Sequence, residues 1–74
     1  MKDKDVLARK FGKHLKKMRT QHGISSAELA RRCFIEKSHV SMMESGDSNP
    51  TLFTLHKIAD ALELSIEQLF KGFE

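Results

Sequence analysis

The sequence predicts an all-α fold made of five helices. Its composition favours helix over sheet, because the 74 residues include no Trp or Tyr, one Pro and only four Gly. Apolar residues recur every three or four positions over most of the chain, which is the spacing of one helix face. Residues that cap helices stand at the ends of these stretches. We therefore expect residues 1–74 to form one domain, near the lower size limit for a single apolar core.

The first helix is expected over about residues 4–22, with Gly23 as its C-terminal cap. Gly12 lies inside this helix, and the sequence leaves open whether it marks a close helix contact or is simply tolerated there. Four apolar residues at helical spacing form the expected buried face, namely Leu7, Phe11, Leu15 and Met18.

Two short helices are expected next, with almost nothing between them. The first covers about residues 26–33 and begins at a capping box made by Ser25 and Glu28. The second covers about residues 37–45 and ends at Gly46. Three residues are left to turn the chain between these helices, namely Phe34, Ile35 and Glu36.

The last two helices fall within about residues 51–71, where we expect the rest of the core and a dimerisation surface. Thr51 caps the longer helix after the loop "GDSNPT". A capping box of Ser65 and Gln68 opens the shorter helix, which ends near Lys71. The buried stripe of the longer helix is expected to contain Leu52, Leu55, Ile58, Ala59 and Leu62.

Two short helices joined by about three residues are the pattern of a helix-turn-helix, here over about residues 25–45. In that motif the first helix braces against the DNA backbone and the second lies in the major groove. At the start of the second helix, Lys37 can reach guanine acceptors or a phosphate. Solvated serines are the alternative explanation, but an exposed helix selected only for stability would carry Glu, Lys or Ala. The outward row of the second helix consists of Ser38, Ser41, Met42 and Ser45.

The charge of the chain is unevenly distributed. Residues 1–50 hold 11 Lys or Arg against 6 Asp or Glu, a net charge of +5, whereas residues 51–74 hold 2 against 4, a net charge of −2. This asymmetry favours one face that meets a polyanion, although lysines that only aid solubility would give a similar count. The basic side chains expected near DNA phosphates include Lys13, Lys16, Lys17, Arg31 and Arg32.

Four linked stretches of the chain resemble a known family. They are "MRTQHGIS" before the second helix, "AELARR" within it, "HVSMMESG" in the third helix and "NPTLFTLHKIADAL" in the fourth. Together they are similar to the lambda-repressor-like, Cro-type helix-turn-helix domain, often called the XRE family. The resemblance covers about residues 15–70 and implies a compact five-helix DNA-binding domain. Several members of similar length are restriction–modification controller proteins, and others are phage repressors or antitoxins.

The resemblance also implies roles for individual residues. It implies a salt bridge between Arg19 in the first helix and Glu44 at the end of the third. A phosphate contact falls on Ser26, where members usually carry a longer Gln, and a further contact of this kind is assigned to Ser45. The base-reading positions of the family fall on Lys37, Ser38, Ser41 and Met42. His39 occupies a place where members often carry Tyr, Ser or Thr, and a contact with either a base or a phosphate is open to it.

Two residues beside the expected reading helix depart from the pattern of the family. Members usually have a Gly with positive φ at the turn, where this chain has Phe34, so we expect a strained residue or a different turn. Glu36, at the cap of the third helix, suits the helix dipole but would repel a nearby phosphate. We therefore assign Glu36 to the base-reading set, accepting a hydrogen bond from cytosine.

Other kinds of site are not indicated by the sequence. The four His residues lie on different segments without carboxylates or Cys at metal-ligand spacing, so we expect no metal, cofactor or small-molecule ligand. Cys33 falls on a buried face without a His to activate it, so we expect a core role for it. Nothing in the sequence resembles a phosphate-cradling loop or a catalytic pair of carboxylates, so we expect no enzymatic activity. With one Cys, no long apolar run and no signal-peptide core, the sequence predicts a cytoplasmic protein that does not contact membranes.

The last helix and the end of the fourth helix are expected to form a two-fold homodimer on an inverted-repeat operator, with Phe70 or Phe73 as an anchor. A frayed tail is the alternative for Phe73, which stands at the terminus. One short helix cannot turn all of its apolar residues inward, and exposed Phe rings would leave a patch unusual for a monomer. A protein-interaction module, such as an antitoxin with secondary DNA binding, is the alternative to a homodimeric regulator. The residues expected at the dimer interface are Ile66, Leu69, Phe70 and Phe73.

Overall fold

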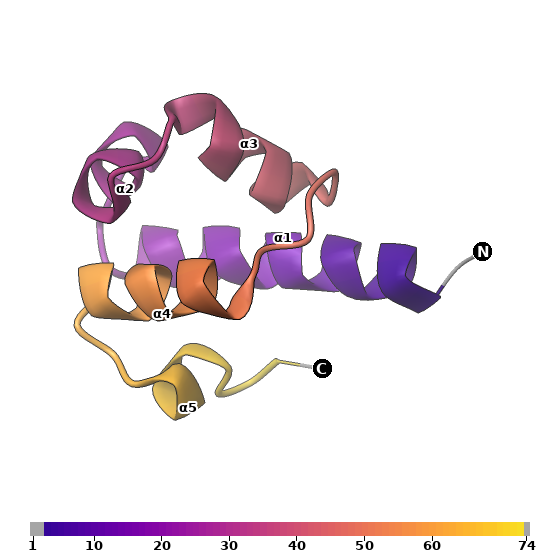
Figure 1. Cartoon of the computed structure of the whole chain (residues 1–74). Helices are drawn as coiled ribbons and strands as arrows, with labels where there is room; N and C mark the ends of the chain where they lie inside the picture. Colours follow the sequence, from indigo (N-terminus) through magenta and orange to yellow (C-terminus); the bar gives the residue numbers. More distant parts are fainter. Residues whose placement is uncertain (1–2, 74) are drawn as a thin grey trace.

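The computed structural model describes residues 3–73 and contains five helices (Figure 1). No strand occurs in this part of the chain, so the predicted all-α fold is confirmed. The last helix is shorter than predicted, because residues 70–72 form a turn. The helices are α1 (Asp3–Gln21), α2 (Ser26–Cys33), α3 (Lys37–Ser45), α4 (Leu52–Ala61) and α5 (Ile66–Leu69).

The helices are arranged on two sides of the long helix α1, which runs the length of the molecule. In Figure 1, α2 and α3 lie on one side of α1 and α4, and α5 lies on the other side. Helix α3 packs against α1 and α2, whereas α4 packs against α2 and α5. The pair α2–α3 therefore forms one face of the molecule, remote from the C-terminal helix.

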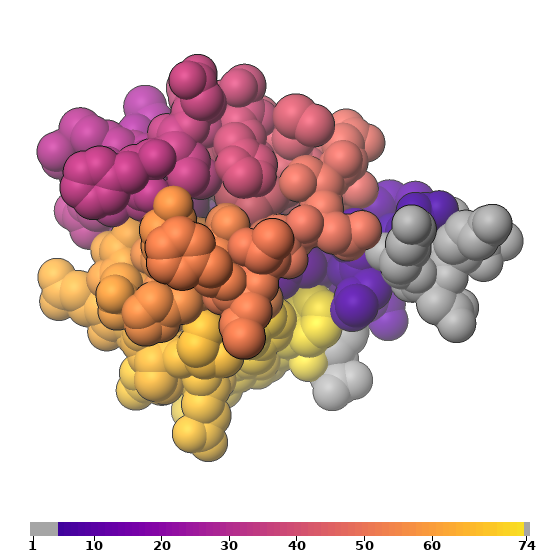
Figure 2. Space-filling model, in the orientation of Figure 1, coloured from indigo at the N-terminus to yellow at the C-terminus, as the bar shows by residue number. Residues whose placement is uncertain are grey.

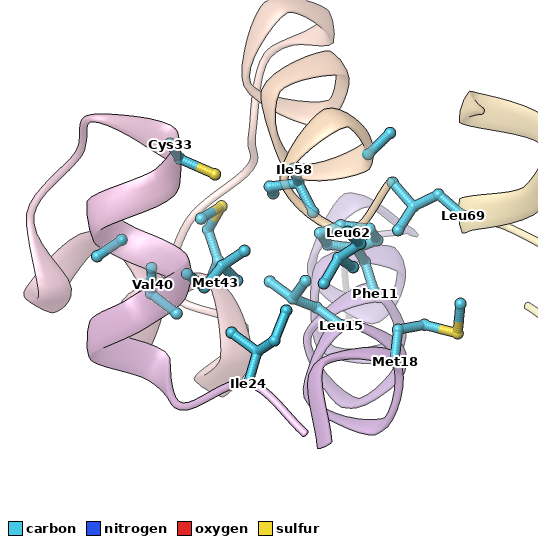
Figure 3. Packing of buried hydrophobic residues seen from close by; sticks show 13 residues of the cluster. Phe11, Leu15, Met18, Ile24, Cys33, Val40, Met43, Ile58, Leu62 and Leu69 are labelled. Atoms are coloured by element: carbon cyan, nitrogen blue, oxygen red, sulfur yellow. The ribbon is translucent and has the colours of Figure 1, made fainter. Parts of the chain in front are cut away.

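Side chains from all five helices meet in one apolar core, of which Figure 3 shows the packing. Leu15 of α1 and Ile58 of α4 lie between the α2–α3 pair and Leu69 of α5. Burying a side chain of this size stabilises the fold by about 1.5–3 kcal/mol. The largest fully buried side chains are Leu15, Leu29, Met43, Ile58, Leu69, Val40 and Cys33.

Two residues predicted in the core are exposed. Leu7 is 55% exposed at the rim of a hollow that it lines together with Phe73, and the next residue of α1, Ala8, is buried instead. Leu52 is 75% exposed. At 100° per residue, Leu52 stands about 90° from the centre of the buried stripe of α4, and Thr54 is buried in its place.

Candidate nucleic-acid interface

The turn between α2 and α3 has a positive φ at its bulky residue, as the resemblance implies for the Gly that usually stands there. Phe34 ends α2 in the left-handed region, with φ 58° and ψ 41°. The amide of Ile35 donates to the carbonyl of Ala30 at 3.0 Å, which closes the helix in the manner usual for a Gly at this position. The conformation costs a non-Gly residue about 1–2 kcal/mol. The Phe34 side chain is 89% exposed, so the predicted strain is present and no packing offsets it.

The start of α2 is capped less completely than predicted. The Ser25 Oγ accepts a hydrogen bond from the amide of Glu28 at 3.1 Å, which is one half of a capping box. The carboxylate of Glu28 instead accepts hydrogen bonds from Arg31 and Arg32 on the next turn. These two hydrogen bonds, first that of Arg31 and then that of Arg32, lower the pKa of Glu28.

Helix α3 lies unusually close to α1 at Gly12. A Cβ atom on Gly12 would stand 2.5 Å from the carbonyl oxygens of Met43 and Glu44. The backbone of α3 therefore rests directly on α1, and only Gly allows this approach. Of the two explanations that the sequence left open for Gly12, the close helix contact is the correct one.

The salt bridge implied by the family resemblance is formed. Arg19 Nε donates to Glu44 Oε2 at 2.6 Å and Arg19 Nη2 donates to Glu44 Oε1 at 3.1 Å, a bidentate pair with side-chain exposures of only 11% and 12%. The hydrogen bond to Glu44 raises the pKa of Arg19. Arg19 Nη1 also donates to the carbonyl of Ile24 at 2.9 Å. One guanidinium group therefore joins α1, the end of α3 and the chain before α2.

With α3 fixed from behind, its other side faces solvent. Figure 2 shows the α2–α3 segment as one continuous surface at the top of the molecule. Lys37 is exposed, and Met42 keeps 47% of its surface accessible. His39 is half-buried at the edge of this surface. We call the exposed set the outward face of α3, consisting of Lys37, Ser38, Ser41 and Met42.

Ser45 also lies on this side of α3, but its hydroxyl group is already engaged. Its Oγ donates within the last turn of the helix, to the carbonyl of Ser41 at 3.0 Å, and lies 3.0 Å from Asp47 Oδ2. A phosphate at Ser45 would meet this carboxylate. The structure thus disfavours the phosphate contact that was assigned to Ser45.

The basic residues assigned to phosphates do not form one cluster. Arg31 is 74% exposed on α2, whereas Arg32 donates from Nη1 to the carbonyl of Ala61 at 3.0 Å and so fastens α2 to the end of α4. Lys17 lines a hollow of about 240 Å³ with Phe73, on the α5 side of α1. Lys13 lines the same hollow, so neither lysine is near the outward face of α3.

Two of the remaining phosphate candidates are placed without conflict. Lys16 is exposed on α1, and its backbone carbonyl accepts from Thr20 Oγ1 at 2.9 Å. Ser26 is the first residue of α2 and is half-buried. Backbone amides at the start of a helix are available to an anion, so the short side chain of Ser26 leaves this end of α2 accessible.

The predicted dimer residues are more buried than expected. Leu69 is 0% exposed, because α5 packs it into the core, so its assignment to an interface was wrong. His14 Nε2 donates to the carbonyl of Leu69 at 2.6 Å and holds this end of the chain on α1. Phe70 and Phe73 are half-buried, with their ring centroids 5.6 and 6.5 Å from that of Phe11.

Sequence reasoning missed a pair of exposed apolar residues at the start of α4. Leu52 is 75% exposed and Phe53 is 66% exposed, with the ammonium group of Lys57 lying 4.9 Å from the Phe53 ring centroid. The signal was available for Phe53, since at 100° per residue it stands nearly opposite the centre of the buried stripe of α4. Beside them, Pro50 and Leu55 line a hollow of about 140 Å³ that continues to Phe70 and Phe73.

Other chemistry receives no support from the part of the chain that the structure describes. Cys33 is 1% exposed, and burial raises the pKa of its thiol group. Among the side chains that the structure describes, those of residues 5–73, no group of three or more His, Cys, Asp or Glu is placed to hold a metal ion. None of the helices described is both long and apolar enough to span a bilayer.

Comparisons with known proteins agree with this geometry. The family model described as Helix-turn-helix (HTH_3) matches residues 15–69. Among curated proteins, the control protein C.MunI of Mycoplasma sp is 30% identical over 66 residues, which cover 88% of this chain and 89% of that protein. The antitoxin HipB of Escherichia coli is 38% identical over 52 residues, covering 70% of this chain but 59% of that protein.

Solved structures give the same result. The restriction–modification controller protein C.AhdI from Aeromonas hydrophila superposes with a TM-score of 0.83 at 34% identity, over 88% of this chain and 98% of that chain. The wild-type controller protein C.Esp1396I superposes with a TM-score of 0.83 at 27% identity, over 90% and 87% of the two chains. On the extent of the family match and the shared five-helix fold, the chain belongs to the helix-turn-helix family.

Proposed function

We propose that this protein is a sequence-specific DNA-binding transcriptional regulator that inserts α3 into the major groove. One observation carries the proposal. Helix α3 is held from behind by Gly12 and by the Arg19–Glu44 pair, while its outward face has small polar and flexible side chains exposed to solvent. Small side chains let a helix axis approach the groove floor, where base edges are read. Membership of the helix-turn-helix family supports the same function.

The proposal divides the contacts into two kinds. Base readout falls to the outward face of α3, with Glu36 and His39 at its edge. Phosphate contacts fall to the start of α2 at Ser26, to Arg31 and to Lys16, which fix the register without reading sequence. Arg32 acts mainly as a structural residue, because its guanidinium group is bonded to Glu28 and to the end of α4.

We further propose that the protein acts as a homodimer. A single recognition helix reads too few base pairs to select one site in a genome, and two-fold symmetry doubles the site. The proposed interface combines the exposed Leu52 and Phe53 with the half-buried Ile66, Phe70 and Phe73. It would place the recognition helices about 34 Å apart, which requires an inverted repeat with half-sites one helical turn apart.

Among regulators, a restriction–modification controller is the role that the similarities favour. C.MunI and C.AhdI match this chain over 89% and 98% of their own lengths. The similarity to HipB supports an antitoxin as the second candidate, although it covers 59% of that protein. The neighbouring reading frame distinguishes the two roles, since a restriction enzyme or methyltransferase gene supports a controller and a small toxin gene supports an antitoxin.

Binding to duplex DNA should depend steeply on salt. Each phosphate that the protein neutralises is expected to add about −0.9 to the slope of log affinity against log salt concentration. Fluorescence anisotropy with a labelled duplex measures this slope between low and physiological salt. Arg31→Ala should make the slope less steep by about one phosphate contact, whereas Lys71→Ala, an exposed position just beyond the end of α5, should leave it unchanged. Affinity that hardly changes with salt would argue against DNA as the ligand.

The oligomeric state should respond to a charge placed on the start of α4. Phe53→Asp is expected to convert a micromolar dimer into a monomer, because it places a carboxylate in the proposed apolar interface. Phe34→Asp is the matched control, since Phe34 is also exposed but lies in the turn between α2 and α3. Sedimentation velocity reports both states. A wild-type protein that stays monomeric even with operator DNA would refute the homodimer.

A further inference from the structure

Two oppositely charged residues stand side by side at the start of α3 and do not pair with each other. Glu36 occupies the N-cap position with an extended backbone, but its side chain makes no capping hydrogen bond. Lys37 is the first residue of the helix, and both residues are exposed. Among residues 5–73, whose side chains the structure describes, neither takes part in a salt bridge. A carboxylate and an ammonium group are therefore both available for contacts with a ligand at the N-terminal end of the proposed reading helix.

A free carboxylate is costly in the major groove unless a hydrogen-bond donor meets it. The phosphates repel it, and leaving its solvation shell without a new partner is unfavourable. The donors on base edges in that groove are the amino groups of cytosine and adenine, and cytosine N4 is the usual partner of Glu. The ammonium group of Lys37 needs acceptors, which guanine supplies as O6 and N7.

One base pair offers both kinds of group together. A C·G pair presents the cytosine amino group next to the guanine O6 and N7 acceptors. We infer that Glu36 and Lys37 jointly read one C·G pair in each half-site, with cytosine at Glu36 and guanine at Lys37. This inference rests on the proposed function and specifies the sequence that the site selects.

Met42 fixes a second position in the half-site. It lies five residues beyond Lys37, which corresponds to about 7.5 Å along the helix. Base pairs are stacked about 3.4 Å apart, so Met42 falls about two base pairs away. Its side chain is 47% exposed and apolar, which suits contact with a thymine methyl group. The hydroxyl groups of Ser38 and Ser41 fit more than one base and leave the intervening pairs less strictly defined.

Selection of bound duplexes from a randomised DNA pool tests this assignment. The wild type should enrich an inverted repeat whose half-sites contain a C·G pair and a T·A pair about two positions away. Glu36→Gln should change the preferred C·G pair to A·T, because an amide pairs with adenine N6 and N7, with a change in relative affinity of about tenfold or more. Met42→Ala should relax only the T·A position. Asp47→Asn is the control for lost negative charge, since Asp47 is exposed beyond the end of α3.

The outcomes separate this inference from the function on which it rests. A pool in which the wild type enriches no sequence would contradict the proposed function, and with it the inference. An enriched site without the C·G pair would overturn the inference alone. So would a Glu36→Gln variant that binds every sequence more tightly, as Asp47→Asn should, with no change in base preference.

Discussion

Replacing Gly12 with Ala should destabilise the protein by about 2–3 kcal/mol, the usual cost of forcing extra atoms into a packed contact. The new Cβ atom would stand 2.5 Å from the carbonyl oxygens of Met43 and Glu44, which belong to the helix backbone and cannot rotate away. Helix propensity alone predicts the opposite sign, since Ala is favoured over Gly by about 1 kcal/mol inside a helix. The sign of the measured change therefore decides between a close contact and a tolerated glycine.

Urea denaturation followed by circular dichroism measures this difference. Lys13→Ala is the matched control, because Lys13 is the neighbouring residue on α1 and is exposed. We expect the control to change the free energy of unfolding by less than about 0.5 kcal/mol. A Gly12→Ala variant more stable than the wild type would show that α3 can move away from α1 at no cost.

Breaking the Arg19–Glu44 pair is expected to cost about 3 kcal/mol. The two side chains are only 11% and 12% exposed, so Arg19→Met would leave a carboxylate in a site largely shielded from water. Removing one partner of a buried pair is far more harmful than losing an exposed one. The carbonyl of Ile24 would lose its guanidinium donor in the same variant.

A double-mutant cycle shows whether the cost comes from the pair itself. Arg19→Met combined with Glu44→Leu should be less destabilising than the sum of the single changes, because no unpaired charge remains. The exposed contact between His56 and Asp60 provides the comparison, and Asp60→Asn should have little effect. Strict additivity of the two changes at Arg19 and Glu44 would mean that the pair contributes nothing as a pair.

The parts of the fold that local chemistry determines could be predicted from the sequence. The start of α4 at Thr51 and the capping box of Ser65 and Gln68 are formed as predicted, since each cap involves residues three positions apart. The end of α4 carries no comparable signal. Glu63 adopts φ 59° there without being Gly. The carbonyl of Ala61 accepts a hydrogen bond from Arg32, which lies 29 positions away in the sequence.

Burial at the ends of helices could not be predicted either, because it depends on elements that are distant in the sequence. Periodicity shows which face of a helix is apolar, but not how far along the helix the neighbouring elements extend. Leu7 is exposed although it shares the apolar spacing of Phe11 and Leu15, and Leu69 is buried in a short helix that the hydrogen bond from His14 Nε2 to its carbonyl holds on α1. The Arg19–Glu44 pair could be predicted only from the family resemblance. The base-reading and dimer assignments stay predictions.

The way α3 is held has a consequence for how new binding specificities can arise. The helix is fixed by the backbone contact at Gly12, by Glu44 and by the buried Val40 and Met43. None of the exposed positions on its outward face contributes to this attachment. Exchanging those side chains should therefore redirect the protein to a different operator without repacking its core, so that recognition and folding can be altered independently in one nine-residue helix.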